Sequence, residues 1–111
     1  MEIEIEFYIT SNGECPFDVW LEGIKDLKTK TKILTRLDRV RIGNFGDFKG
    51  GVGEGVSELR MDYGAGIRMY YSKIGNKVIL LLCGGTKRSQ EKNIKTAEEY
   101  LKEYHSRGKK K

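Results

Sequence analysis

The sequence predicts an α+β domain with the element order β-α-α-β-β-β-α, in which helices pack on a largely antiparallel sheet. Three observations support this class. Apolar residues alternate with mostly acidic ones in residues 3–9, a period of two that is typical of a half-buried strand. Two segments with helical spacing of apolar residues follow. Three short strand-like runs, separated by glycine-containing turns, then precede a last helical segment.

The two helices of the first half have recognisable boundaries. The first begins at Pro16, because proline suits the first helical position. The second is expected over about residues 28–42, since Gly43-Asn44 is a helix-stop signal. The residues predicted to be buried are Phe17, Trp20, Ile24 and Leu27 in the first helix and Ile33, Leu34, Leu37 and Val40 in the second. The side chains expected to face away from the core are Lys32, Arg36 and Arg39.

A glycine-rich segment, residues 44–55, follows the second helix. It lacks the Gly-Lys-Ser/Thr ending of a phosphate-binding nucleotide loop and does not join a strand to a helix, which excludes that kind of site. We expect either a mobile connector or a flexible substrate lip that carries Lys49.

Residues 56–61, 67–73 and 77–83 are predicted strands, joined by the turn at 63–66 and by a tight hairpin at Gly75-Asn76. The third strand is apolar throughout residues 78–82, so it should be central and covered on both faces. A last helix follows, with Ser89 as a candidate cap. Its predicted apolar stripe is Ile94, Ala97, Leu101 and Tyr104. The domain is expected over residues 1–105, with a basic disordered tail at 106–111.

Charge and composition restrict the class of protein. The chain has 111 residues and a net charge of +5, and residues 28–49 carry seven lysines and arginines against two acids. Such grouping is typical of a protein that binds a polyanion. A long apolar run and a basic leader are both missing, which predicts a cytoplasmic protein without membrane spans. The two cysteines and single histidine form no zinc-binding pattern, so we expect no metal and no cofactor.

The first hairpin places two arginines together. If it is centred on Gly64, Arg60 lies directly opposite Arg68, on the face away from Leu59, Met61, Ile67 and Met69. Like charges at this spacing destabilise a sheet, so the pair requires an acid or an external anion. Glu58 is the available acid, which gives a structural interpretation. The alternative is a phosphate clamp, to which the guanidinium fork is well suited. The clamp interpretation predicts that both arginines project onto one concave face, with Lys87 at its edge. It also predicts that replacing either arginine leaves stability unchanged or slightly raised.

The same register, extended through the second hairpin, places Cys83 beside Arg68. Lys87 and Gln90 then lie near the start of the last helix, close to both arginines, and a helix start itself favours anions. The chain offers no histidine pair, no dense carboxylate cluster and no nucleophilic triad. What remains is electrostatic catalysis by fixed cations, with Lys49 or Lys87 as proton donor or acceptor.

Several motifs together resemble a known family. They are residues 43–49 (GNFGDFK), 53–60 (GEGVSELR), 66–71 (GIRMYY) and 80–87 (LLLCGGTK), with Gln90. The combination resembles the addiction-module killer proteins of the RelE/HigB toxin superfamily, in their phage-derived branch, over roughly residues 5–101. The resemblance implies a RelE-like fold and the toxin of a toxin–antitoxin module, which cleaves mRNA without a metal, commonly on the ribosome, and so inhibits translation.

The resemblance also implies partners and site residues. The partners are mRNA and a cognate antitoxin, usually a helix-turn-helix protein, with operator DNA bound only through the antitoxin complex. By position, the implied catalytic residues are Arg60, Arg68 and Lys87, and more loosely Lys49. The candidate RNA-binding residues are Arg36, Arg39, Arg88, Gln90 and Tyr70. Some relatives carry a lysine where this chain has Glu58, and others a terminal tyrosine or histidine near Asn93.

Two alternatives to an RNA-cleaving toxin remain open. One is a non-catalytic RNA-binding module similar to a double-stranded-RNA-binding domain, because three strands followed by a helix suit that layout. The other is an inactive, phage-derived regulatory protein. Tyr70 is a candidate for stacking on a base, although an aromatic side chain on a sheet more often packs in a core.

Overall fold

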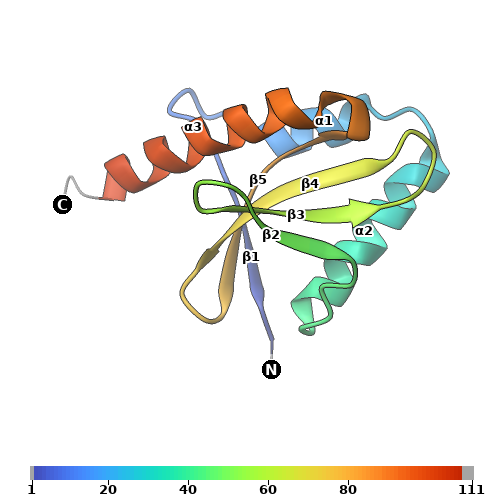
Figure 1. The fold of residues 1–111 in the computed structure, drawn as a ribbon, viewed down its shortest axis with the longest axis horizontal. Helices are drawn as coiled ribbons and strands as arrows, with labels where there is room; N and C mark the ends of the chain where they lie inside the picture. The colour runs from blue at the N-terminus through green and yellow to red at the C-terminus, as the bar shows by residue number, and fades with distance from the viewer. Residues whose placement is uncertain (1, 109–111) are drawn as a thin grey trace.

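The computed structural model describes residues 2–108, which form one five-stranded mixed sheet with helices on both faces (Figure 1). The strand order is β1-β5-β4-β3-β2. The strands are β1 (Glu4–Phe7), β2 (Phe48–Gly53), β3 (Val56–Met61), β4 (Ile67–Ile74) and β5 (Val78–Thr86). The β1–β5 pairing is parallel, and the pairings of the other neighbouring strands are antiparallel. The predicted α+β class with a largely antiparallel sheet is therefore confirmed.

The helices divide between the two faces of the sheet (Figure 1). Helices α1 (Pro16–Gly23) and α2 (Leu27–Arg41) pack on one face. A short 3-10 turn, η1 (Lys87–Ser89), leads into α3 (Gln90–Gly108), which covers the other face. Strand β5 sends Ile79 and Leu81 to the first core and Leu80 and Leu82 to the second. The prediction that this strand is covered on both faces is confirmed.

Two residues of the predicted core, Leu27 and Leu34, are exposed. Asp26 caps the helix by accepting a hydrogen bond from the Lys28 backbone N–H at 3.3 Å. Leu27 therefore begins a new helix, 76% exposed, instead of extending the apolar stripe of α1. Leu34 is 50% exposed, because the buried stripe of α2 runs through Ile33, Leu37 and Val40.

The prediction of a connector over residues 44–55 is wrong in its second half, which forms strand β2 at the edge of the sheet. Phe48 pairs with Leu59, and Lys49 pairs with Glu58. The register then shifts before Gly53, and Gly51 has a positive φ of 64°. Glycines carry no side chain that reveals a period of two, so this strand has no readable pattern in the sequence.

The end of α3 also differs from expectation. The helix does not fray from Ser106 but continues to Gly108. Arg107 forms an ion pair with Glu103 one turn earlier and donates a hydrogen bond to the carbonyl of Ile9 at 2.8 Å, which holds the last turn. The rest of the predicted tail, residues 109–111, lies outside the described residues. The predicted stripe of α3 is confirmed, since its four members pack in the second core. Within residues 2–108, none of the helices has the length and apolarity to cross a membrane.

Candidate functional site

The predicted arginine pair lies on neighbouring strands in the predicted register. Arg60 of β3 is directly opposite Arg68 of β4, between the pairs Met61–Ile67 and Leu59–Met69. The alternation of the strands sends both arginines to the face covered by α3 and their neighbours to the other core. Two like charges thus share one small area of the sheet.

A buried carboxylate lies between the two arginines. Glu58 is 0% exposed, and its Oε1 atom is 3.6 Å from Nε of Arg60 and 3.8 Å from Nε of Arg68. The side-chain amide of Gln90 donates to both carboxylate oxygens at 3.0 Å. The acid required by the structural interpretation is therefore present, and Gln90 on the first turn of α3 fixes it.

The donors in this cluster nevertheless outnumber the acceptors. The distances from Glu58 to the two arginines are those of ion pairs without a hydrogen bond. Nε of Arg60 and Nε of Arg68 are both buried and have no hydrogen-bond partner among the described residues. One buried carboxylate is shared by two guanidinium groups, and the cluster keeps unused N–H donors. Such a site favours an added anion.

The two arginines differ sharply in exposure. The Arg60 side chain is 39% exposed, and the Arg68 side chain is 2% exposed, with Nη1 donating to the carbonyl of Ile67 at 3.0 Å. The prediction that both arginines project onto one concave face is therefore wrong for Arg68, which is buried. The cause is the close approach of α3: Gly85 lies beside Arg68 in the sheet, and a Cβ atom there would collide with Oδ1 of Asn93.

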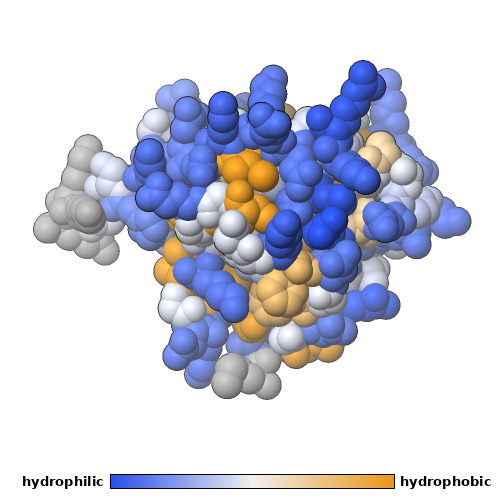
Figure 2. Space-filling model, viewed as in Figure 1, coloured by the Kyte–Doolittle hydropathy of each residue, from blue (hydrophilic) through white to orange (hydrophobic). Residues whose placement is uncertain are grey.

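Lys87 joins the cluster from the turn before α3. Its backbone N–H donates to the carbonyl of Gly66 at 2.8 Å. A Cβ atom on Gly66 would be 3.1 Å from Cβ of Lys87 and 3.8 Å from Nη1 of Arg68, so the lysine stem and the guanidinium are neighbours. Lys87 is exposed, and its ammonium has no ion pair within the described part of the chain. Figure 2 shows hydrophilic side chains around the start of α3.

The other predicted cations are distributed more widely. Lys49 pairs with Glu58 across β2 and β3 and lies exposed on the edge strand, on the same face as the cluster. Arg88 is exposed in η1. The predicted contact between Cys83 and Arg68 is wrong, because Cys83 pairs with Tyr70. The hairpin pairs Ile74 with Val78, which moves the register by one residue, and the irregularity between Tyr70 and Tyr71 moves it by one more.

Tyr70 cannot stack on a base, contrary to the prediction. It is 0% exposed and packs in the core beneath α3 with Leu80, Leu82 and Ala97. Burial, together with the nearby Glu58 carboxylate, raises the pKa of its hydroxyl well above the ordinary range. The hydroxyl is buried and has no hydrogen-bond partner among residues 2–108.

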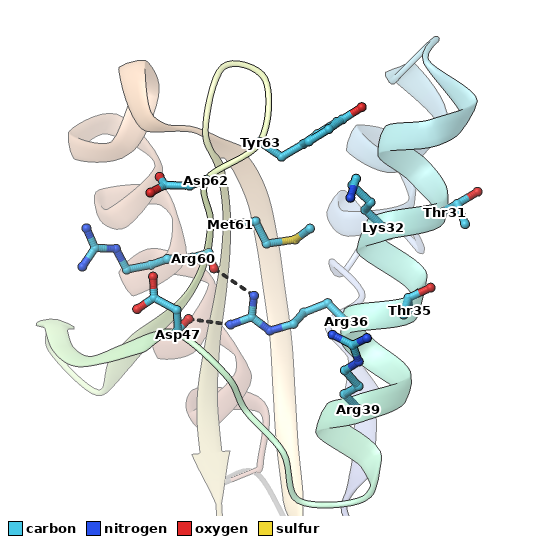
Figure 3. Close-up of a pocket in the computed structure, with 10 residues that line it drawn as sticks. All are labelled: Thr31, Lys32, Thr35, Arg36, Arg39, Asp47, Arg60, Met61, Asp62 and Tyr63. Carbon is cyan, nitrogen blue, oxygen red and sulfur yellow. Dashed lines mark hydrogen bonds between the residues drawn. The ribbon is translucent and has the colours of Figure 1, made fainter.

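Arg36 has a structural role, while its assignment as an RNA-binding residue stays a prediction. Its guanidinium donates to the carbonyls of Phe45, Asp47 and Arg60, with the Arg60 contact at 2.8 Å. These bonds fasten the segment after α2 to the end of β3 (Figure 3). Arg39, one turn further along α2, is exposed and lines a groove of about 530 Å³.

This groove lies between α2 and the end of β3 with its following turn. Its α2 wall carries Lys32, Arg36 and Arg39, and its opposite wall carries Met61 and Tyr63. The Arg60 side chain points from the groove toward α3 (Figure 3). The groove therefore adjoins the charged cluster, with Arg60 at the boundary between the two.

Comparison with known proteins gives one clear relationship. The chain matches no protein-family model. It is 43% identical over 98 residues to a Haemophilus influenzae protein described as uncharacterized, and the match covers 88% of this chain and 92% of that protein. The chain belongs to the family of this Haemophilus protein. The description of that relative names no activity, so the site is what indicates the function of this chain.

Two features of the site were missed by sequence reasoning. The first is the pairing of Gln90 with Glu58, which are 32 residues apart and are brought together only by the packing of α3 on the sheet. The second is the groove at Tyr63, whose ring centre lies 4.7 Å from the Lys32 ammonium. An aromatic residue in a glycine-rich turn was the available signal for it.

The described residues contain no group of three or more histidine, cysteine, aspartate or glutamate side chains placed to hold a metal ion. Cys83 is buried, which raises the pKa of its thiol to about 12 and keeps it protonated at neutral pH. The polar chemistry available at the start of α3 is that of guanidinium, ammonium, amide and one carboxylate group.

Proposed function

We propose that this protein is the RNA-cleaving toxin of a toxin–antitoxin module, with a RelE-like fold and a metal-independent mechanism. The observation that carries the proposal is the convergence of Arg60, Arg68 and Lys87 around one carboxylate, with buried donors left unused. An RNA phosphate carries the negative charge and the acceptor oxygens that these unused N–H donors require. The resemblance to RelE/HigB toxins supports the same assignment of residues.

In the proposed reaction the ribose 2′-oxygen attacks the adjacent phosphorus and loses its proton to a base. The bond from phosphorus to the 5′-oxygen breaks, and that oxygen receives a proton. The products are a 2′,3′-cyclic phosphate and a 5′-hydroxyl. Arg60 contacts the phosphate oxygens directly, while Arg68, on the buried side of the cluster, stabilises the developing negative charge. Lys87, or Lys49 from the edge strand, carries the proton.

The chemistry is tested on the products and on the substrate. Ribosomes programmed with a defined mRNA are incubated with the protein, and the ends of the fragments are analysed. We expect a cyclic phosphate or its hydrolysis product, and a 5′-hydroxyl. A 2′-O-methyl group at the cut nucleotide should abolish cleavage there, because the attacking oxygen is blocked. Cleavage of free RNA should persist in EDTA; loss on chelation with recovery in Mg²⁺ contradicts this mechanism.

The biological part of the proposal has a separate test. Induction of this chain alone should arrest growth, and co-expression with the neighbouring gene should restore it and yield a stable complex. A neighbouring gene for a helix-turn-helix protein agrees with the proposal. Normal growth at confirmed soluble levels of this chain contradicts it.

One observation favours a second candidate, a non-catalytic RNA-binding protein. Glu58 already compensates part of the arginine charge, and Arg68 is almost completely buried. In that case RNA binds at Arg60 and Lys87 without cleavage. The five-stranded sheet with helices on both faces departs from the three-strand layout of a double-stranded-RNA-binding domain. Binding of RNA without any fragments, on or off the ribosome, would identify this alternative.

A further inference from the structure

We infer that the groove between α2 and the turn after β3 is a subsite for one unpaired nucleotide of the RNA, whose base stacks on Tyr63. This inference rests on the proposed function and names the part of the substrate that the groove binds. The groove measures about 530 Å³, which is enough for a nucleotide. It combines an aromatic ring with cationic side chains, the combination by which proteins hold single strands.

The first support is the surroundings of the Tyr63 ring. Tyr63 is only partly buried, in the turn between β3 and β4. The Lys32 ammonium lies 4.7 Å from the ring centre, a cation–π contact that covers the ring face on the α2 side. A base stacked on this face displaces the ammonium, which is then free to contact the neighbouring phosphate. Lys32 therefore shows on which face of the Tyr63 ring a base would stack, and its ammonium is placed to pair with a phosphate.

The second support is the arrangement of charge along the groove. Lys32 and Arg39 extend from α2 on one wall (Figure 3). Asp47 and Asp62 also line the groove, but their carboxylates point away from α2, to the side on which the Arg60 guanidinium lies (Figure 3). The interior between the helix and the strand is therefore dominated by cations, which suits the backbone of a nucleic acid.

The third support is rigidity. The three carbonyls that accept from Arg36 belong to the segment after α2 and to the end of β3. This side chain ties the two walls of the groove together at one end. A preformed site binds a flexible single strand with a smaller ordering cost.

The fourth support is continuity with the charged cluster. Arg60 lines the groove, and its Nε atom lies 3.6 Å from Glu58 in the cluster, so Arg60 is the residue that the groove and the cluster share. An RNA strand that passes from the groove around Arg60 to the cluster would carry the base at Tyr63 close to the scissile phosphate. This gives the groove a role in positioning the RNA and not only in attracting it.

The test uses the full-length protein and a single-stranded oligonucleotide with 2′-O-methyl sugars, which resists cleavage, and one 2-aminopurine. Stacking on Tyr63 should quench the 2-aminopurine fluorescence. Tyr63→Leu should abolish the quenching and weaken binding about 5- to 150-fold, while Tyr63→Phe keeps both. Arg39→Gln should lower the slope of log affinity against log salt by about 0.7, as expected for one phosphate contact.

The outcomes separate this inference from the proposed function. Thermal melting of each variant confirms that it is folded. If the wild type cleaves RNA while Tyr63→Leu, folded, binds and quenches like the wild type, the base lies elsewhere and the inference is wrong, although the proposed function stands. If the wild type neither binds the oligonucleotide nor cleaves RNA, both are wrong.

Discussion

The two ends of helix α3 are both attached to the sheet through a carboxylate, but the two attachments differ in balance. At the C-terminal end, Glu103 accepts from the Tyr8 hydroxyl at 2.6 Å and from Nε of Arg107 at 2.9 Å. Arg107 also donates to the carbonyl of Ile9, and its guanidinium lies 5.6 Å from the Tyr8 ring centre. Each of these donors therefore has an acceptor.

The N-terminal end has the opposite character. Glu58 accepts from Gln90 and lies beside two arginines whose Nε atoms have no hydrogen-bond partner in the described part of the protein. A matched network holds a helix in place, whereas a buried surplus of cationic donors costs stability unless an anion is supplied. The difference indicates that the C-terminal end of α3, at Glu103 and Arg107, is a structural attachment and that the end near Glu58 is the candidate binding site.

The largest expected effect is on cleavage activity, and it distinguishes the N-terminal end of α3 from the C-terminal end. Arg60→Gln removes the exposed cation of the cluster, and cleavage should fall about 10²- to 10³-fold because its charge acts mainly in the transition state. The melting temperature should stay close to that of the wild type, since this side chain is 39% exposed. Lys102→Gln, an exposed cation on α3, is the matched control and should retain activity. Full activity in a folded Arg60→Gln protein would show that the catalytic residue is elsewhere.

The second effect is on stability and distinguishes Arg68 from Arg60. Arg68→Gln leaves the buried Glu58 carboxylate with less compensation, and the free energy of unfolding should fall by about 3 kcal/mol, contrary to the expectation for an open arginine clamp. Denaturant titration measures the change. The double variant Glu58→Gln/Arg68→Gln should recover part of the loss, because the uncompensated charge is gone. If Arg68→Gln is as stable as the wild type, Glu58 does not depend on Arg68.

A third change increases the surplus of donors at the start of α3. Glu58→Gln removes the carboxylate and keeps the shape of the side chain. The affinity for a non-cleavable single-stranded oligonucleotide should rise about tenfold, because the arginines lose their internal anion. Binding is measured by fluorescence anisotropy at fixed salt. An affinity that falls instead would mean that Glu58 positions the arginines for the RNA and does not compete with it.

The smallest effect is expected at the C-terminal end. Tyr8→Phe removes one hydrogen bond to Glu103 and should cost about 1 kcal/mol, with cleavage unchanged. Burial and the Glu103 carboxylate raise the pKa of Tyr8 from 10.0 to about 12. The contribution of its neutral hydroxyl is therefore complete below pH 10 and lost as the pH rises toward 12. Between pH 10 and 12, the melting temperature of Tyr8→Phe should therefore fall less than that of the wild type.

Local patterns in the sequence predicted the elements that depend on near neighbours. Pro16 marks the start of α1, and the turn around Gly64 sets the pairing of Arg60 with Arg68. These features follow from backbone geometry and a period of two, which act over a few residues. The same reasoning failed at β2, where the glycines at positions 50, 51 and 53 leave no alternation.

The accessibility of the predicted site residues depends on the tertiary structure. Alternation along the strands was sufficient to place Arg60 and Arg68 on one face, but it did not show that α3 covers Arg68 and Tyr70 and leaves Arg60 half-exposed. Nor did the helical pattern of α2 show that three backbone carbonyls occupy the guanidinium of Arg36. Burial depends on elements that are distant in sequence, and the packing of α3 over the last residues of β5 sets it here. A residue's side of the sheet is a local property, whereas its contact with solvent is a property of the whole fold.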